Sequence, residues 1–145
     1  MIKWHIETRK VTDLKEWAKN PRLLTEKGIN DLTQSISKFG LAEPIVINTD
    51  CLILGGHARV KVLKAQGEIE CDCYVPDRTF NDKEIEEINI RLNANQAGIW
   101  DTERLANEWD VAELKDWGLD MVDFKDNTDK IEDEEDKEKC SCCGK

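Results

Sequence analysis

The sequence predicts an α+β fold, in which a small mixed sheet carries packed helices and a short helical segment follows. Short β-branched runs such as 45–47 stand between turn residues and are typical of strands. Stretches such as 26–39 place apolar residues three and four positions apart, which is typical of helices that cover a sheet. With 145 residues, the chain has room for one domain with a real core.

The N-terminal segment is expected to hold a strand and then a helix. Ile2, Trp4 and Ile6 alternate with polar residues, which predicts a half-buried strand. The apolar residues of 26–39 fall on one helical face, and Thr25 before them is a suitable N-cap. These features place a strand at the start of the chain and a capped helix after it.

The middle of the chain predicts a hairpin, a helix and another strand. The apolar runs 45–47 and 52–54 flank the turn residues Asn-Thr-Asp, so they predict two antiparallel strands. A helix over 57–66 is expected next, and the alternation in 69–75 predicts the strand that follows it.

The second half of the chain is expected to be helical and then irregular. Asn81 can cap a helix, because Glu84 stands at the position that completes a capping box. Two shorter helices are predicted at 102–108 and 111–117. We expect one domain over 1–124, a charged disordered linker over 125–139, and a cysteine-rich terminus over 140–145.

The charge distribution argues against direct DNA binding. The net charge is −10, and it is uneven. Residues 1–80 carry 12 Lys/Arg against 11 Asp/Glu, whereas residues 81–124 carry 4 against 12. Because DNA affinity comes largely from clustered Lys/Arg, weak or no direct DNA binding is expected. The sequence has no apolar run of membrane-spanning length and no signal-peptide pattern, so the expected location is cytoplasmic.

The run Gly55-Gly56-His57-Ala58-Arg59 has the composition of a phosphate-binding turn. It lies between a predicted strand and a predicted helix, where free backbone N–H groups meet the positive end of the helix dipole. Glycines allow an anion to approach the backbone, and an arginine fork matches phosphate oxygens. Alone, the same run also fits a plain hairpin-to-helix turn with a surface arginine.

The order of several motifs adds to this interpretation. The motifs are Asn20-Pro21-Arg22, the runs 40–47, 52–59 and 63–67, and Arg91-Leu92-Asn93-Ala94-Asn95. Together they resemble the ParB/sulfiredoxin superfamily, and most closely the ParB-like (ParB-like nuclease) domains of phage proteins and of proteins beside DNA methyltransferases. The resemblance covers roughly residues 5 to 120 and implies a ParB-like small mixed sheet with packed helices.

The resemblance also implies a ligand and the residues that bind it. Members of the family bind CTP or ATP at the glycine turn, so Gly55, Gly56, His57 and Arg59 are expected to surround the phosphates. Asn95 is expected to approach them directly or through a magnesium ion. His57 stands where sulfiredoxin has its nucleophilic cysteine, so the repair chemistry of sulfiredoxin is not expected.

Three functions remain open at this point. The first is a nucleotide-binding accessory domain of DNA metabolism, whose protein partner is a methyltransferase or a terminase. The second is an enzyme, either a ParB-like nuclease or a nucleotide-dependent phosphotransferase, with Glu43 and His57 as catalytic groups. The third is a non-catalytic protein-interaction domain that uses the acidic second half as its contact surface.

Two further sets of residues are candidates for chemistry. Cys140, Cys142 and Cys143 form a cluster of the zinc-knuckle type, for which Cys51, His5 or a second subunit would supply the fourth ligand. Three tryptophans (Trp100, Trp109 and Trp117) resemble a base-stacking set. Because they stand among acidic residues, we expect them to pack the short C-terminal helices instead.

Overall fold

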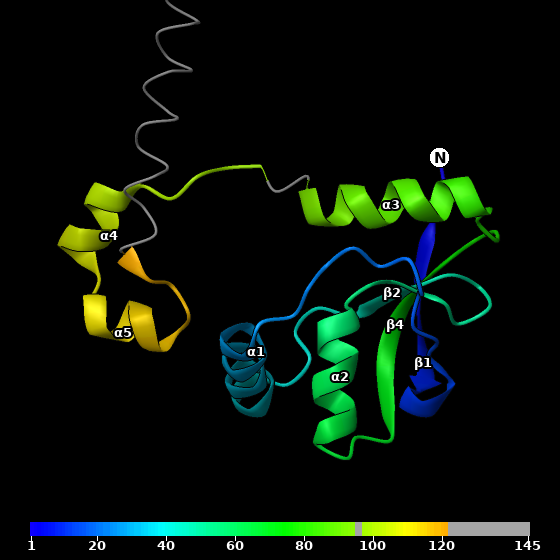
Figure 1. Cartoon of the computed structure of the whole chain (residues 1–145), viewed down its shortest axis with the longest axis horizontal. Coiled ribbons are helices and arrows are strands. Elements are labelled where there is room, and N and C mark those ends of the chain that lie inside the picture. The colour runs from blue at the N-terminus through cyan, green and yellow to red at the C-terminus, as the bar shows by residue number, and fades with distance from the viewer. Residues whose placement is uncertain (95–96, 122–145) are drawn as a thin grey trace, which may run out of the picture. The chain divides into compact units, whose positions relative to one another are not determined.

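The computed structural model describes residues 1–94 and 97–121. The chain divides into two compact units, Met1–Ala97 and the part from Gly98 on. The N-terminal unit contains the sheet, and the described part of the C-terminal unit contains two short helices (Figure 1). The expected domain end at 124, the linker and the cysteine-rich terminus lie outside the described residues.

The sheet of the N-terminal unit has four strands and is mixed. The strands are β1 (Trp4–Lys10), β2 (Ile45–Ile47), β3 (Ile53–Gly55) and β4 (Glu70–Pro76). Their order is β1-β4-β2-β3. β1 pairs antiparallel with β4, β2 pairs antiparallel with β3, and β2 runs parallel to β4. The predicted α+β fold class and the predicted hairpin are therefore confirmed.

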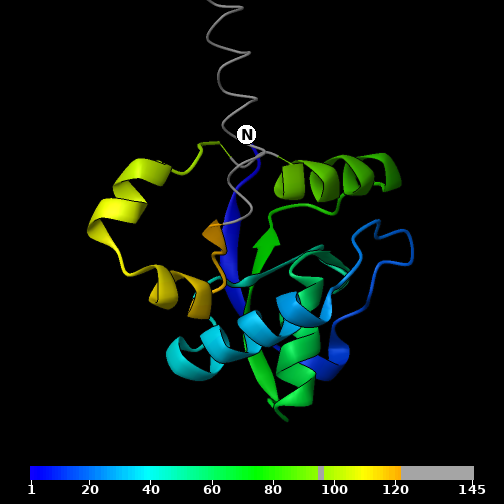
Figure 2. The ribbon, with the colours of Figure 1, turned by 60° about the vertical axis from the view of Figure 1, so that its left-hand side comes forward.

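Three α-helices and one 3₁₀ turn complete the N-terminal unit. They are η1 (Val11–Asp13), α1 (Glu26–Phe39), α2 (His57–Ala65) and α3 (Asp82–Ala94). α1 and α2 pack against each other on the same side of the sheet, and α3 contacts β3 (Figures 1 and 2). The C-terminal unit contains α4 (Thr102–Glu108) and α5 (Val111–Asp116).

The helix starts follow the predicted capping residues. Thr25 Oγ1 accepts a hydrogen bond from the Gly28 N–H at 3.0 Å, as expected for the N-cap of α1. At α3, Asn81 Oδ1 accepts from the Glu84 N–H at 2.9 Å, and the Glu84 carboxylate accepts from the Asn81 N–H at 3.3 Å. This reciprocal pair is the predicted capping box.

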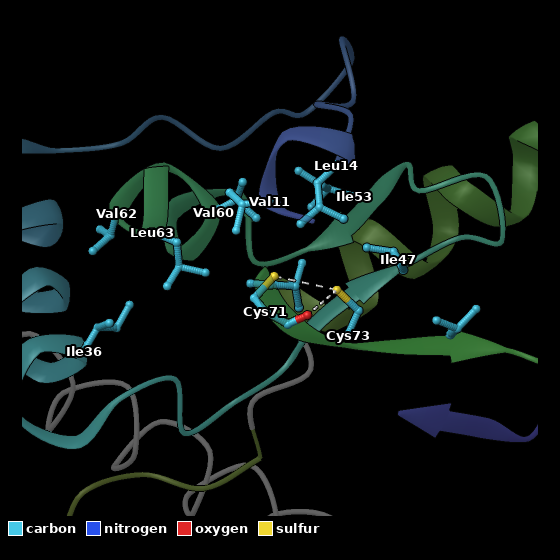
Figure 3. Close-up of a cluster of buried hydrophobic side chains, with 12 residues drawn as sticks. Val11, Leu14, Ile36, Ile47, Ile53, Val60, Val62, Leu63, Cys71 and Cys73 are labelled. Carbon is cyan, nitrogen blue, oxygen red and sulfur yellow. Dashed lines mark hydrogen bonds between the residues drawn. The ribbon is translucent and has the colours of Figure 1, made fainter. Parts of the chain in front are cut away.

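The main core fills the space between the sheet and the helices α1 and α2 (Figure 3). Ile45, Ile47 and Ile53 of the β2–β3 hairpin are fully buried. They meet apolar side chains of α2, among them Val60 and Leu63. The glycine turn between β3 and α2 therefore joins two elements that the core holds rigidly.

The outward face of β1 differs from the prediction. Ile2 is partly buried and Trp4, 36% exposed, packs edge-on against Phe80, but the prediction of a half-buried apolar face is wrong at Ile6, which is 58% exposed. The register with β4 explains the difference. Ile6 pairs with the exposed Tyr74, whereas Glu7 pairs with the fully buried Cys73. Glu7 can occupy that position because its carboxylate forms an ion pair with Arg9.

A buried asparagine fixes α3 relative to the hairpin. The side chain of Asn48 lies in the β2–β3 turn and is almost fully buried. Its Nδ2 donates to the Phe80 carbonyl at 3.2 Å, and its Oδ1 accepts from the Phe80 N–H at 3.0 Å. Asn89 of α3 donates from Nδ2 to the Leu54 carbonyl at 3.1 Å. These bonds hold the end of β3 against α3.

No helix in the described parts of the chain is both long and apolar enough to cross a membrane.

Candidate functional site

The glycine turn has a conformation that requires glycine. Gly55 ends β3, and Gly56 follows with φ +98° and ψ +24°, a left-handed conformation that side chains disfavour. A Cβ atom at Gly56 would lie 2.9 Å from Arg59 Nη2 and 3.1 Å from Ile45 Cδ1. The absence of a side chain thus serves both the turn and the close approach of Arg59.

Helix α2 begins at His57, directly after this turn. The first intrahelical bond runs from the Val60 N–H to the Gly56 carbonyl at 3.0 Å. The amides that precede Val60 have no carbonyl one turn earlier in the helix, and Gly56 has no side chain to cap them. The start of α2 therefore presents N–H donors at the positive end of the helix dipole.

Arg59 lies in the first turn of α2 and folds back over the glycine turn. Its Nη1 donates to Glu43 Oε2 at 3.1 Å, and its Nη2 donates to the Pro44 carbonyl at 3.2 Å. The buried Nε has no hydrogen-bond partner among the described residues. Burial lowers the pKa of Arg59, and the neighbouring Glu43 carboxylate opposes this. An arginine nevertheless stays protonated at neutral pH, so the site keeps a positive charge.

His57 is held as a hydrogen-bond acceptor. Its Nε2 accepts from the Trp17 N–H at 3.4 Å, so the proton of the neutral ring lies on Nδ1. Burial lowers the pKa of His57, and the charge of Glu16 partly offsets this. The segment that carries Trp17 is fixed beside β3, because the Ile53 N–H donates to the Lys15 carbonyl at 2.9 Å.

A cavity of about 210 Å³ adjoins the start of α2. Four segments line it: the loop that contains Arg22, helix α1 through Leu32, the glycine turn with His57 and Arg59, and the end of α3 with Asn93. Arg22 Nη1 donates to Asn93 Oδ1 at 2.8 Å, and Asn93 Nδ2 donates to the Asn89 carbonyl at 2.7 Å. Within the described residues the lining has two arginines and no carboxylate, which is the lining expected for an anion.

The structure brings four of the predicted site residues together and leaves one aside. Gly55, Gly56, His57 and Arg59 all line the cavity. Glu43 does not line it, and its side chain is 80% exposed while it pairs with Arg59. The predicted contribution of Asn95 lies outside the described residues.

Arg22 and Asn93 are among the cavity residues that were not predicted as site residues. Arg22 belongs to the motif Asn20-Pro21-Arg22 and Asn93 to the motif 91–95, and the resemblance that these motifs carry predicted no site role for either residue. The available signal is the spacing of Asn89 and Asn93, four residues apart on one helix face. That spacing shows that the two side chains are neighbours, but not what they face.

The expected zinc cluster of Cys140, Cys142 and Cys143 lies outside the described residues. Among the residues that the structure does describe, no three His, Cys, Asp or Glu side chains form a group able to hold a metal ion.

The mixed sheet, its covering helices and the glycine turn at the start of α2 define the chain as a domain with a ParB-like fold. The structure is similar to chromosome-partitioning protein ParB from Caulobacter crescentus complexed with CTP-γ-S, with a TM-score of 0.61 and 20% sequence identity. That match covers 81% of this chain and 73% of the ParB chain.

Two further structures share the fold. The Pnob8-like ParB-N domain matches with a TM-score of 0.57 and 19% identity, over 73% of this chain and 44% of that chain. Caulobacter crescentus ParB complexed to the centromeric parS site matches with a TM-score of 0.50 and 19% identity, over 80% of this chain and 66% of that chain. This chain thus spans less than half of the Pnob8-like chain. No family model matches the sequence, and no curated protein matches it.

Proposed function

We propose that this chain is a nucleotide-binding domain that holds the phosphates of CTP or ATP at the turn from Gly55 to Arg59. The observation that carries the proposal is the cavity at the start of α2, which combines a helix N-terminus with two arginines and no carboxylate among its described lining residues. Both features favour a multiply charged anion. The likeness to a ParB chain complexed with CTP-γ-S supports a nucleotide as that anion.

Each residue of the turn has a role in this proposal. Gly55 and Gly56 let phosphate oxygens approach the backbone amides. Arg59 exchanges the exposed Glu43 carboxylate for a phosphate, and its unpartnered Nε adds a donor. Arg22 supplies the second positive charge, and His57 supplies the Nδ1–H. We assign Asn95 to the phosphates or to a magnesium ion that the phosphates carry.

A catalytic role is less well supported than a binding role. The enzyme alternative, a nuclease or phosphotransferase, needs Glu43 and His57 as acid and base at the phosphates. Glu43 is paired with Arg59 and is not part of the cavity lining. His57 Nε2 is already engaged by the Trp17 amide. We therefore propose binding and not catalysis. The resemblance to ParB-like domains of proteins beside DNA methyltransferases supports an accessory domain of DNA metabolism, with a methyltransferase or terminase as its partner.

Calorimetric titration of CTP and of ATP, each with magnesium, into the full chain tests the proposal. We expect binding by the wild type and a loss of roughly tenfold or more in affinity in Arg59→Ala and in Arg22→Ala, since each removes charge-assisted hydrogen bonds. Lys64→Ala is the matched control, because Lys64 is an exposed cation at the other end of α2. It should bind as the wild type does.

Two results would contradict the proposal. If the folded wild type binds neither nucleotide, the site assignment is wrong. If Arg59→Ala and Arg22→Ala bind as tightly as Lys64→Ala does, the nucleotide occupies another site. A phosphate-release assay on wild type and Glu43→Gln then separates the two functions: turnover that Glu43→Gln abolishes would favour the enzyme alternative.

A further inference from the structure

The C-terminal unit exposes three large aromatic side chains. Trp100, Trp109 and Trp117 are 57%, 44% and 62% exposed. The buried contacts between α4 and α5 come instead from Leu105 and Leu114. The expectation that the tryptophans pack these helices is therefore wrong, and their exposure needs another explanation, because clustered exposed apolar surface marks interaction sites.

The three tryptophans line one open groove of about 500 Å³ together with Leu105, Leu114 and Leu119. The charged residues of the lining are Asp101 and Arg104, and both are already engaged. Asp101 accepts the Arg104 N–H at 3.0 Å as the N-cap of α4, and Arg104 Nε donates to Glu108 at 3.2 Å. A small polar ligand needs convergent polar groups, so this groove is better suited to apolar side chains.

The net charge of residues 98–121, which contain the groove, indicates which kind of partner the groove binds. Residues 98–121 carry seven Asp/Glu against two Lys/Arg. Such a surface repels nucleic acid and anionic lipid and attracts Lys and Arg. The described part of this unit has helices and no strand, so it offers no sheet edge to an extended peptide. The groove has aliphatic as well as aromatic walls, contributed by Leu105, Leu114 and Leu119, and such a surface fits the apolar face of an amphipathic partner helix.

We propose that the groove formed by Trp100, Trp109, Trp117 and the three leucines docks a basic amphipathic helix of a protein partner. Apolar side chains of that helix fill the groove, and its Lys and Arg side chains face the surrounding carboxylates. The groove and the cavity at the start of α2 share no lining residue, and the inference does not depend on nucleotide binding.

Fluorescence anisotropy with a labelled peptide tests the inference on the full chain. The probe is a leucine–lysine amphipathic helix about five turns long, and its matched control carries glutamate in place of every lysine. We expect the lysine peptide to bind and the glutamate peptide to bind at least roughly tenfold more weakly. Added salt should weaken the binding of the lysine peptide, because screening reduces the attraction.

Variants of the chain locate the binding. Trp117→Ala should lower the affinity for the lysine peptide roughly tenfold or more, as expected for a central aromatic anchor. Phe39→Ala is the control, because Phe39 is an exposed aromatic residue of the other unit. This variant should bind the lysine peptide with the affinity of the wild type. Reversing two exposed carboxylates of α5 (Glu113→Lys with Asp116→Lys) leaves the groove residues in place and should also weaken the peptide. If Trp117→Ala unfolds α4 and α5, the double variant still tests whether the lysine peptide binds at this groove.

Several outcomes would overturn the inference. They are equal binding of the lysine and glutamate peptides, no binding of the lysine peptide, and binding that both the Trp117→Ala and the charge-reversal variants leave unchanged. Self-association of the chain that Trp117→Ala abolishes would identify a second copy as the occupant. Binding of a DNA fragment that Trp117→Ala abolishes would identify a nucleic acid.

Discussion

The ion pair between Arg59 and Glu43 joins two side chains in different surroundings. Arg59 is 22% exposed and Glu43 is 80% exposed. An ion pair with one partner in solvent contributes little to stability, about 0–1 kcal/mol. Its exchange for a phosphate therefore costs little, while the Pro44 carbonyl holds the guanidinium in position. The weak contact with Glu43 is therefore compatible with the proposed role of Arg59 in binding phosphate.

His57 predicts a pH dependence of stability. Burial lowers its pKa below the ordinary value of 6.5, so below pH 6.5 the unfolded chain binds a proton that the folded chain resists. The contribution of neutral His57 to the free energy of unfolding is therefore fully present above pH 6.5. It is lost as the pH falls toward the lower pKa that His57 has in the folded chain. We expect the free energy of unfolding, measured in urea, to fall between pH 7.5 and 5 less steeply in His57→Gln than in the wild type.

His5 provides the control for this measurement. It is the other of the two histidines, and it is exposed on β1. His5→Gln leaves the half-buried ring of His57 in place, so the fall in the free energy of unfolding that His57 causes should remain in this variant. The explanation fails if His5→Gln flattens the curve and His57→Gln does not.

Alanine substitutions at two glycines, one before and one after α2, should lower the free energy of unfolding by different amounts. Gly56 and Gly67 both have positive φ, +98° and +74°, but a Cβ at Gly67 meets nothing within 4 Å. Gly67→Ala should therefore cost about 1 kcal/mol for the left-handed backbone alone. Gly56→Ala also displaces Arg59 and presses on Ile45, so it should cost about 1 kcal/mol more. Urea unfolding measures both, and equal costs would show that the close approach of Arg59 carries no weight.

Local patterns in the sequence predicted most of the elements. Thr25 and Asn81 cap helices because their side-chain bonds are made within one turn, and such bonds can be recognised from the spacing of residues. The hairpin follows from its two apolar runs and the polar turn. The face of β1 could not be predicted in the same way, because pairing with β4, a partner distant in sequence, decides which side is buried.

The candidate site was predictable only in part, for a related reason. The glycine turn and Arg59 lie within five consecutive residues, so the motif contains them all. Arg22 and Asn93 are 71 positions apart, and their hydrogen bond exists because Asn48 and Asn89 hold α3 beside β3. Sequence spacing carries no information about a contact of that range.

At the scale of the whole molecule, the two units should differ in local stability. The described C-terminal unit has a cluster with two buried residues, Leu105 and Leu114, whereas the main cluster of the N-terminal unit has twelve. We expect backbone amides of α4 and α5 to exchange with solvent much faster than those of β4, measured by NMR. Leu114→Ala should accelerate exchange in α4 and α5 and leave β4 unchanged. Faster exchange in β4 of that variant would show that the units open together.

The central strand also carries two thiols whose chemistry follows from their position. Cys71 and Cys73 lie on the core face of β4, with their sulfur atoms 3.9 Å apart (Figure 3). Burial raises the pKa of Cys71 and raises the pKa of Cys73 to about 12. Because the thiolate is the reactive form, burial and the raised pKa make Cys73 unreactive at neutral pH while it stays in the core. Alkylation of Cys73 therefore requires an opening that exposes the core face of β4, and labelling at this thiol reports that opening.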